Sequence, residues 1–202
     1  MANKKIKHNY QSIEGWFNME QQYLELLNDC PDGGTFVELG CFKGKSTSFI
    51  VTEIINQKRK VNFTTIDSFE GHTNSTDSNE VKAYNGINNI FEDFRANTKH
   101  ISNYLAKNKE LSDSLNIYAC LSHEGAYFFK DASVDVLFID AGHSYEAVKK
   151  DIEAWLPKMK PNGIIAGHDY NSWVGVKNAV NEKFGTPHKV DNDCWFIYLE
   201  KL

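Results

Sequence analysis

The sequence lacks any apolar stretch long enough to span a bilayer, and its basic start, MANKKIKHNY, is not followed by an apolar run. A membrane-spanning helix needs about 20 consecutive apolar residues. A secretory signal needs an apolar segment directly after its basic residues. We therefore expect no signal peptide, no membrane contact and a cytoplasmic location.

Cysteine is scarce, and the four residues present are scattered along the chain at Cys30, Cys41, Cys120 and Cys194. None of them forms a C-x-x-C pair. This pattern favours reduced thiols in an intracellular protein over a disulfide framework.

Positive charge is also in short supply, since the net charge is -5 and the isoelectric point is about 5.8. A nucleic-acid-binding surface is usually basic, so we expect no nucleic-acid partner. The 202 residues, 41% hydrophobic and 24% charged, are typical of one globular domain. We expect a single domain over residues 1–202 that acts on a small molecule, and the sequence leaves a homo-oligomer open.

Short apolar segments with strand character alternate with helical segments along the chain. Strands are predicted at 35–40, 61–67, 115–122, 134–140, 162–169 and 193–201, and helices at 11–29, 45–57, 144–159 and 175–185. Such alternation is typical of an α/β fold with a doubly wound, mostly parallel sheet covered on both faces. Residues 68–114 interrupt the pattern as a long polar insertion, helical around 87–107, which we expect to form a lid and to bind the acceptor.

Polar side chains gather where the predicted strands end. The strand tails read Glu38-Leu39-Gly40, Asp67-Ser68, Ser122-His123-Glu124, Asp140-Ala141-Gly142-His143 and His168-Asp169-Tyr170-Asn171. Ligands of doubly wound sheets bind outside the carboxyl ends of the strands. These tails are therefore the candidate functional site.

The stretch VELGCFKGKST, residues 37–47, contains a glycine turn that differs from two known nucleotide sites. Gly40 and Gly44 are one residue too close for a phosphate-binding loop, and Phe42 replaces a glycine of the dinucleotide motif. Glu38 would repel a triphosphate and attract an ammonium group, unless it pairs with Lys45 or a backbone amide. Asp67 could accept hydrogen bonds from a ribose diol. Together these features fit S-adenosylmethionine better than ATP or NAD.

With these residues the sequence resembles the class I S-adenosylmethionine-dependent methyltransferases, whose first motif is a strand, an acid and a glycine-rich turn. The resemblance implies a Rossmann-like sheet of seven strands with the last one antiparallel. It also implies an adenine site near Ser122 to Glu124. The cofactor-binding residues expected from motif and resemblance are Glu38, Gly40, Gly44, Ser46, Asp67, Ser68, Ser122 and Asp140.

Two further segments, VDVLFIDAGHSYEAVKKDIEAW and NGIIAGHDYNSWVGVKNAV, resemble a narrower group of small-molecule and sugar O-methyltransferases, and more distantly catechol O-methyltransferase. The resemblance implies a divalent cation held by Asp140 and Asp169, with His168 or Asn171 as a third ligand. It also implies that His143 is a general base, so that the catalytic residues are His143 and Asp140.

Elementary chemistry supports a metal-assisted reaction. A hydroxyl oxygen is a weak nucleophile until a cation lowers its pKa and a base accepts its proton. Carboxylates suit Mg²⁺ or Mn²⁺, whereas an imidazole from His168 would shift the preference toward Mn²⁺, Fe²⁺ or Zn²⁺. The alternative is structural, with Asp140 as a helix cap and His143 and His168 as packed or surface residues.

Three functions remain open at this stage. The first is a metal-assisted O-methyltransferase of a small hydroxylated acceptor such as a sugar or glycoside. The second is a P-loop-like NTPase, because LFID at 137–140 resembles the strand and Asp that hold Mg²⁺ there. The third is a module that binds S-adenosylmethionine without catalysis.

Overall fold

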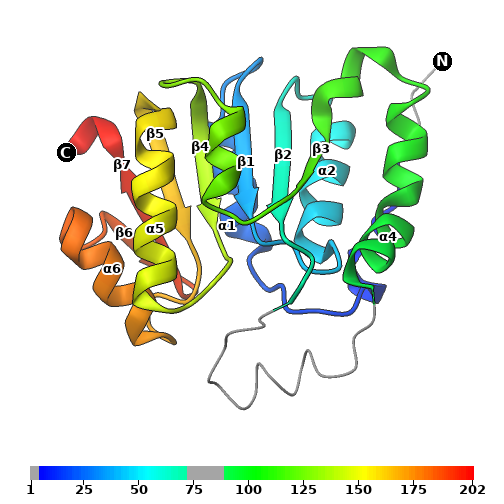
Figure 1. Ribbon diagram of the computed structural model, residues 1–202. Helices are drawn as coiled ribbons and strands as arrows, with labels where there is room; N and C mark the ends of the chain where they lie inside the picture. The colour runs from blue at the N-terminus through cyan, green and yellow to red at the C-terminus, as the bar shows by residue number, and fades with distance from the viewer. Residues whose placement is uncertain (1–4, 72–88) are drawn as a thin grey trace.

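Seven strands form one sheet in the computed structural model, which describes residues 5–71 and 89–202 (Figure 1). The strands are β1 (Thr35–Leu39), β2 (Asn62–Asp67), β3 (Asn116–Ala119), β4 (Val134–Ile139), β5 (Met159–Gly167), β6 (Lys189–Asp191) and β7 (Cys194–Tyr198). Their spatial order is β3-β2-β1-β4-β5-β7-β6. Only β7 breaks the parallel arrangement, since it runs antiparallel to both β5 and β6. The predicted α/β fold, with a mostly parallel sheet and an antiparallel last strand, is confirmed.

Helices cover both faces of this sheet. They are α1 (Glu20–Asp29), α2 (Lys45–Gln57), α4 (Ile90–Leu105), α5 (Tyr145–Trp155) and α6 (Val174–Phe184). Short 3-10 turns lie at η1 (Tyr10–Ser12), η2 (Lys109–Ser114), η3 (Glu124–Phe128), η4 (Leu156–Lys158) and η5 (Leu199–Lys201). None of the helices described is long and apolar enough to cross a membrane.

Alternation along the strands divides the interior into two cores. Phe36 and Phe138 pack with α1, α2 and α4 on one face, whereas Val37 and Leu137 pack with α5 and α6 on the other. Neighbouring side chains of a strand point to opposite faces, and both faces are covered, so every residue of β4 is buried. This explains why the strand segments are almost continuously apolar in sequence.

The predicted helix at 11–29 is wrong in its first half. Only η1 and α1 are helical there, and residues 13–19 run as an irregular arm. Gly15 has a φ of +131°, and a side chain at that position would approach the Phe42 ring to 3.2 Å. The arm is irregular because it packs against the glycine turn, a long-range contact that helical spacing does not reveal.

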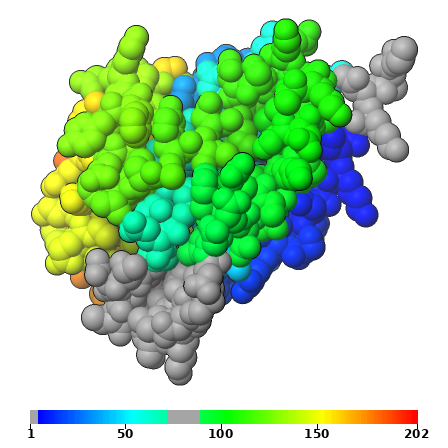
Figure 2. All heavy atoms as spheres, turned by 45° about the vertical axis from the view of Figure 1, so that its right-hand side comes forward, coloured from blue at the N-terminus to red at the C-terminus, as the bar shows by residue number. Residues whose placement is uncertain are grey.

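The predicted insertion at 68–114 contains α4 and η2. Figure 2 shows that the green residues of α4, η2, β3 and η3 cover most of the face at the β3 edge of the sheet. Asn89 begins α4, since its side chain accepts a hydrogen bond from the amide of Glu92, and Glu92 and Asp93 complement the helix dipole. Residues 72–88 of the insertion lie outside the described residues, so its role as a lid and acceptor-binding segment stays a prediction.

The strand order reverses between β1 and β4, which places the expected ligand crevice between their carboxyl ends. In Figure 1 these ends point downward, toward the side where β2 also terminates. The glycine turn follows β1 at this edge, and Asp140 follows β4. The topology therefore brings the two predicted motifs together although 100 residues separate Gly40 from Asp140.

We expect Phe94→Ala to destabilise the fold by about 3–5 kcal/mol, because Phe94 is fully buried and attaches α4 to the glycine turn. Phe91→Ala is the matched control, since Phe91 lies on the same helix and is only half-buried. Urea denaturation would measure both. Equal losses for the two variants would contradict the anchoring role of Phe94.

Candidate functional site

Two strand ends meet at the glycine turn. Gly40 has a φ of +86°, and a Cβ atom there would lie 2.0 Å from the backbone oxygen of Asp140. No side chain fits such a distance, so glycine is required for both its conformation and its size. Gly44 has a φ of +84°, and a Cβ atom there would lie 2.8 Å from the ring of Phe94. The turn is therefore closed in by β4 on one side and by α4 on the other.

Glu38 lies beneath this turn and is fully buried. The hydroxyl of Tyr23 donates to its Oε1 at 2.8 Å, and those of Thr47 and Thr65 donate to its Oε2 at 2.6 and 2.8 Å. Burial raises the pKa of Glu38, while these hydroxyls and that of Ser46 oppose the rise. Glu38 thus holds β1, β2, α1 and α2 together, and its contact with a cofactor amine stays a prediction.

Asp67 ends β2 and fixes the backbone of the turn. Its Oδ2 accepts the amides of Cys41 and Phe42, both at 2.8 Å, and its Oδ1 accepts the amide of Phe69 at 2.7 Å. A carboxylate has about four acceptor positions, so about one remains for a ligand. The predicted pair of ribose hydroxyls would therefore have to share that position or displace an amide.

Lysines of the turn hold the N-terminal arm and α4 in place. Lys43, largely buried, contacts Glu14 at 2.7 Å and Asp93 at 3.0 Å. These hydrogen-bonded carboxylates raise the pKa of Lys43 against the effect of its burial. Lys45 donates to the carbonyl of Gly15 at 2.9 Å. Both ammonium groups thus serve the fold of the turn.

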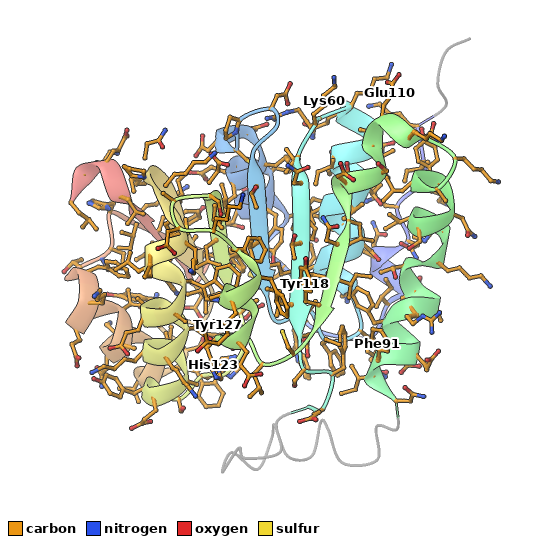
Figure 3. All side chains as sticks on the ribbon, turned by 45° about the horizontal axis from the view of Figure 1, so that its top comes forward. Lys60, Phe91, Glu110, Tyr118, His123 and Tyr127 are labelled. Carbon is orange, nitrogen blue, oxygen red and sulfur yellow. The ribbon has the colours of Figure 1, made fainter. Side chains whose placement is uncertain are left out.

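Ser122 lies in the loop after β3, where the sequence predicts the adenine site. Its hydroxyl donates to Oδ1 of Asp151 at 2.6 Å, and its carbonyl accepts Nε1 of Trp155 at 2.9 Å. Figure 3 shows His123 beside α5 near the end of β3, and Lys60 and Glu110 at the opposite end of the molecule.

Ser68, the remaining predicted cofactor contact, follows β2, and its hydroxyl oxygen accepts a hydrogen bond from the amide of Glu70 at 3.3 Å.

Carboxylates and imidazoles converge at the ends of β4 and β5. His143 Nε2 lies 3.0 Å from Asp169 Oδ2, and His168 Nδ1 lies 3.2 Å from Asp169 Oδ1 and 3.9 Å from Asp140 Oδ1. One ligand atom each from Asp140, His143 and Asp169 falls within 4.8 Å of the others, which suits a divalent ion. The four residues named from the sequence are therefore brought together.

Electrostatics within this cluster are strongly coupled. Burial raises the pKa of Asp140, and His168 opposes that rise. Burial alone would raise the pKa of Asp169. Hydrogen bonds from His143 and His168 outweigh this effect and lower the pKa of Asp169 well below its usual range. Burial opposes a charge on His168, yet Asp169 and Asp140 raise its pKa overall. Asp169 thus carries the negative charge of this cluster most firmly, and a cation would have to replace the positive charge that His168 supplies.

Asp193 is a member of the site that the sequence did not reveal. It lies in the turn between β6 and β7, and with His168 and Asp169 it forms a second group that could hold an ion. Its oxygens accept the amide of Asn171 and the hydroxyl of Ser172, both at 2.5 Å. Asn192 and Asp193 both have positive φ, so the Asn-Asp pair was a turn signal at the start of the predicted last strand.

His143, the candidate base, is held in a fixed orientation. Its ring stacks on Trp173 with centroids 4.8 Å apart and an interplanar angle of 22°. If Nε2 carries the proton donated to Asp169, the lone pair resides on Nδ1. The geometry therefore allows His143 to act as a base or as a ligand.

Comparison with known proteins identifies the fold and the family. Residues 37–170 match a family described as "Methyltransferase domain". The O-methyltransferase NovP aligns with 90% of this chain and 77% of its own, at 20% identity and a TM-score of 0.57. The calicheamicin methyltransferase CalS11 aligns over the same shares at 12% identity and a TM-score of 0.65. These likenesses show the shared fold.

One curated relative, the uncharacterized protein y4gI of Sinorhizobium fredii (strain NBRC 101917 / NGR234), is 45% identical over 40 residues. The match covers 20% of this chain and 4% of that protein. The matched segment is therefore a small part of both proteins.

We expect Asp151→Asn to stabilise the protein more at pH 8 than at pH 4. Burial raises the pKa of Asp151 to about 7, so the folded state keeps a proton that the unfolded state releases above about pH 4. Folding stability of the wild type thus falls as pH rises between these values, by roughly 2–4 kcal/mol, and Asn has no such dependence. Thermal unfolding across this range would test it. A constant difference between the variants would contradict a raised pKa.

Proposed function

The chain belongs to the methyltransferase domain family, and from that premise we propose that it transfers a methyl group from S-adenosylmethionine to a hydroxyl of a small acceptor with the help of a divalent cation. The observation that carries this proposal is the cluster of Asp140, His143 and Asp169 beside the glycine turn. A cofactor at the turn and an ion at the cluster would then be neighbours at one edge of the sheet.

The residues present fit both groups. The donors of the cluster are carboxylates and imidazoles, which bind Mn²⁺ and related ions well. The glycine turn has the close backbone approach that a cofactor site needs, and its lysines are engaged with Glu14, Asp93 and the Gly15 carbonyl. An ATP site would need a lysine available to a phosphate, so this arrangement favours S-adenosylmethionine over the NTPase alternative.

Methyl transfer of this kind is a displacement at carbon. The acceptor oxygen forms a bond to the methyl carbon, the carbon–sulfur bond breaks, and its electron pair remains on sulfur. A bound cation would lower the pKa of the hydroxyl and orient it. With His143 as the base, the ion would rest on the carboxylates of Asp140 and Asp169, because a neutral imidazole has a single lone pair. Asp169 would hold the His143 ring through Nε2, and Nδ1 would accept the proton of the hydroxyl.

A sugar or glycoside is the acceptor class that we propose. CalS11 is a TDP-rhamnose 3'-O-methyltransferase, and NovP is an O-methyltransferase. Both share the fold of this chain, with TM-scores of 0.59 for the apo structure of CalS11 and 0.57 for NovP. A metal that binds hydroxyl oxygen suits a vicinal diol, which can offer two oxygens to one ion. Turnover assays with nucleotide sugars and simple glycosides would test this class.

Chelation should abolish methyl transfer and leave cofactor binding largely unchanged. Asp140→Asn should have the same effect, because it keeps the shape of the side chain and removes the charge that an ion needs. Asp193→Asn is the matched comparison, since Asp193 belongs to the second group of ligands. Calorimetry would follow cofactor binding, and methyl transfer would be followed with added Mg²⁺ or Mn²⁺. Activity that survives chelation and Asp140→Asn would show that the reaction needs no metal.

His143→Ala should lower the rate of methyl transfer by roughly 10²- to 10⁴-fold, the usual contribution of a general base. The loss should become smaller at high pH, because the acceptor hydroxyl then ionises with less help. Trp173→Leu keeps His143 but removes its stacking partner, so we expect a smaller loss of rate than in His143→Ala. A rate for His143→Ala equal to that of the wild type would assign the imidazole a structural role.

A further inference from the structure

Asp151 is a buried carboxyl group that the proposed reaction does not use. It lies on α5, and its side chain has 1% of its surface exposed. Its Oδ1 accepts the Ser122 hydroxyl, whereas its Oδ2 is buried and has no hydrogen-bond partner among the described residues. A buried oxygen without a partner destabilises the fold. An apolar or amide side chain would serve the core better.

The contacts of Asp151 are directed at one residue of the predicted adenine loop. Trp155 lies one turn further along α5, on the same face of the helix, and donates to the carbonyl of Ser122. The hydroxyl and the carbonyl of Ser122 are therefore both held by α5. On the other side of the loop, the amide of Cys120 donates to the carbonyl of Asp67 at 3.1 Å, which links the loop to the end of β2.

The direction of the Ser122 hydrogen bond determines what Ser122 can bind. A hydroxyl has one hydrogen to donate and two lone pairs that can accept. Oδ1 of Asp151 accepts this hydrogen both in the carboxylate and in the acid whose proton lies on Oδ2. The oxygen of Ser122 can then only accept from a ligand. Ser122 is half-buried, so part of the residue remains exposed. A hydrogen-bond acceptor at Ser122 can pair with the amino group of adenine, which donates. It cannot pair with the carbonyl oxygen of hypoxanthine, which also accepts.

We propose that Asp151 is a positioning residue that sets the preference of the cofactor site for a 6-amino purine over a 6-oxo purine by orienting the hydroxyl of Ser122. The inference rests on the proposed function, since it requires that the adenine of S-adenosylmethionine lies at Ser122. It assigns a use to a carboxyl group that lowers the stability of the core. Residues that weaken a fold in this way are often kept for a function.

The test compares the affinities of S-adenosylhomocysteine and S-inosylhomocysteine, measured by calorimetry on the full chain. The wild type should bind the adenosyl compound about tenfold more tightly, the scale of one hydrogen bond that is made or left unmade. In Asp151→Leu the hydroxyl can rotate and donate, so this ratio should fall about fivefold or more. Asp151→Ala provides a second truncation if the leucine variant does not fold.

Two controls separate positioning from a structural effect. Asp151→Asn should retain the ratio, because its amide oxygen can still accept the hydroxyl. Glu153→Gln removes a negative charge from an exposed position of the same helix and should also retain it. Ser122→Ala should lose the ratio as Asp151→Leu does. In the double variant that combines Ser122→Ala and Asp151→Leu, the affinity ratio should fall no further than in either single variant, since both changes remove the same contact.

The outcomes distinguish the inference from the proposed function. A wild type that binds neither compound would overturn the proposed function, and the inference with it. A wild type that binds both equally would overturn the inference alone. An unchanged affinity ratio in Asp151→Leu would also overturn the inference, and so would additive effects of the two changes in the double variant. A ratio that falls in Asp151→Leu and is retained in Asp151→Asn would establish the positioning role.

Discussion

The contact between the backbone of Gly40 and the carbonyl of Asp140 is the constraint on which the site depends. A Cβ atom at Gly40 would lie 2.0 Å from that oxygen, so the two strand ends approach as closely as backbone allows. Gly40 also donates to the carbonyl of Ile66, and Asp140 donates to that of Leu39. These bonds extend the sheet beyond β1 and β4 at the point where the strand order reverses. The glycine turn and the carboxylate cluster are neighbours because of this contact.

Buried and half-buried charged groups around the turn hold backbone and side chains in place. Glu38 accepts three hydroxyls, Asp67 accepts three amides, and Lys43 contacts two carboxylates. Each group joins segments that are distant in sequence. Hydrogen bonds to charged groups contribute more than neutral ones, about 1.5–3 kcal/mol each, which offsets the desolvation of the buried charge. The backbone of the turn is therefore held by side chains from several elements of the fold.

Much of the fold could be predicted from the sequence because the strands are apolar, short and separated by helical segments. The rule that ligands bind at strand ends pointed to Asp140, His143, His168 and Asp169, and the resemblance supplied their roles as ligands and base. Helix 11–29 was predicted too long, since the contact of Gly15 with Phe42 is not visible in local spacing. The short β6 was missed as well, because three residues show no periodicity. The resemblance supplied the number of strands.

The residues that sequence reasoning missed are those whose partners are far away along the chain. Tyr23, Thr47 and Thr65 reach Glu38 from α1, α2 and β2, and nothing near Glu38 in sequence indicates them. Asp151 resembles any polar residue of an amphipathic helix until its burial is known. Long-range partners of buried polar groups depend on tertiary packing, which a local pattern does not encode.

The surroundings of the two candidate ligand groups favour one of them. Both groups share Asp169, but the oxygens of Asp193 already accept hydrogen bonds from Asn171 and Ser172. An ion at Asp193 would have to share both oxygens with the hydrogen bonds that hold the loop after β5. Among the described residues, the ion-pair partner of the Asp140 carboxylate is His168 Nδ1, at 3.9 Å. An ion at Asp140, His143 and Asp169 would compete with the contact between His143 and Asp169, but it would leave the hydrogen bonds of Asp193 in place and would lie beside the glycine turn. This asymmetry gives Asp193 the role of supporting the loop that carries Asp169.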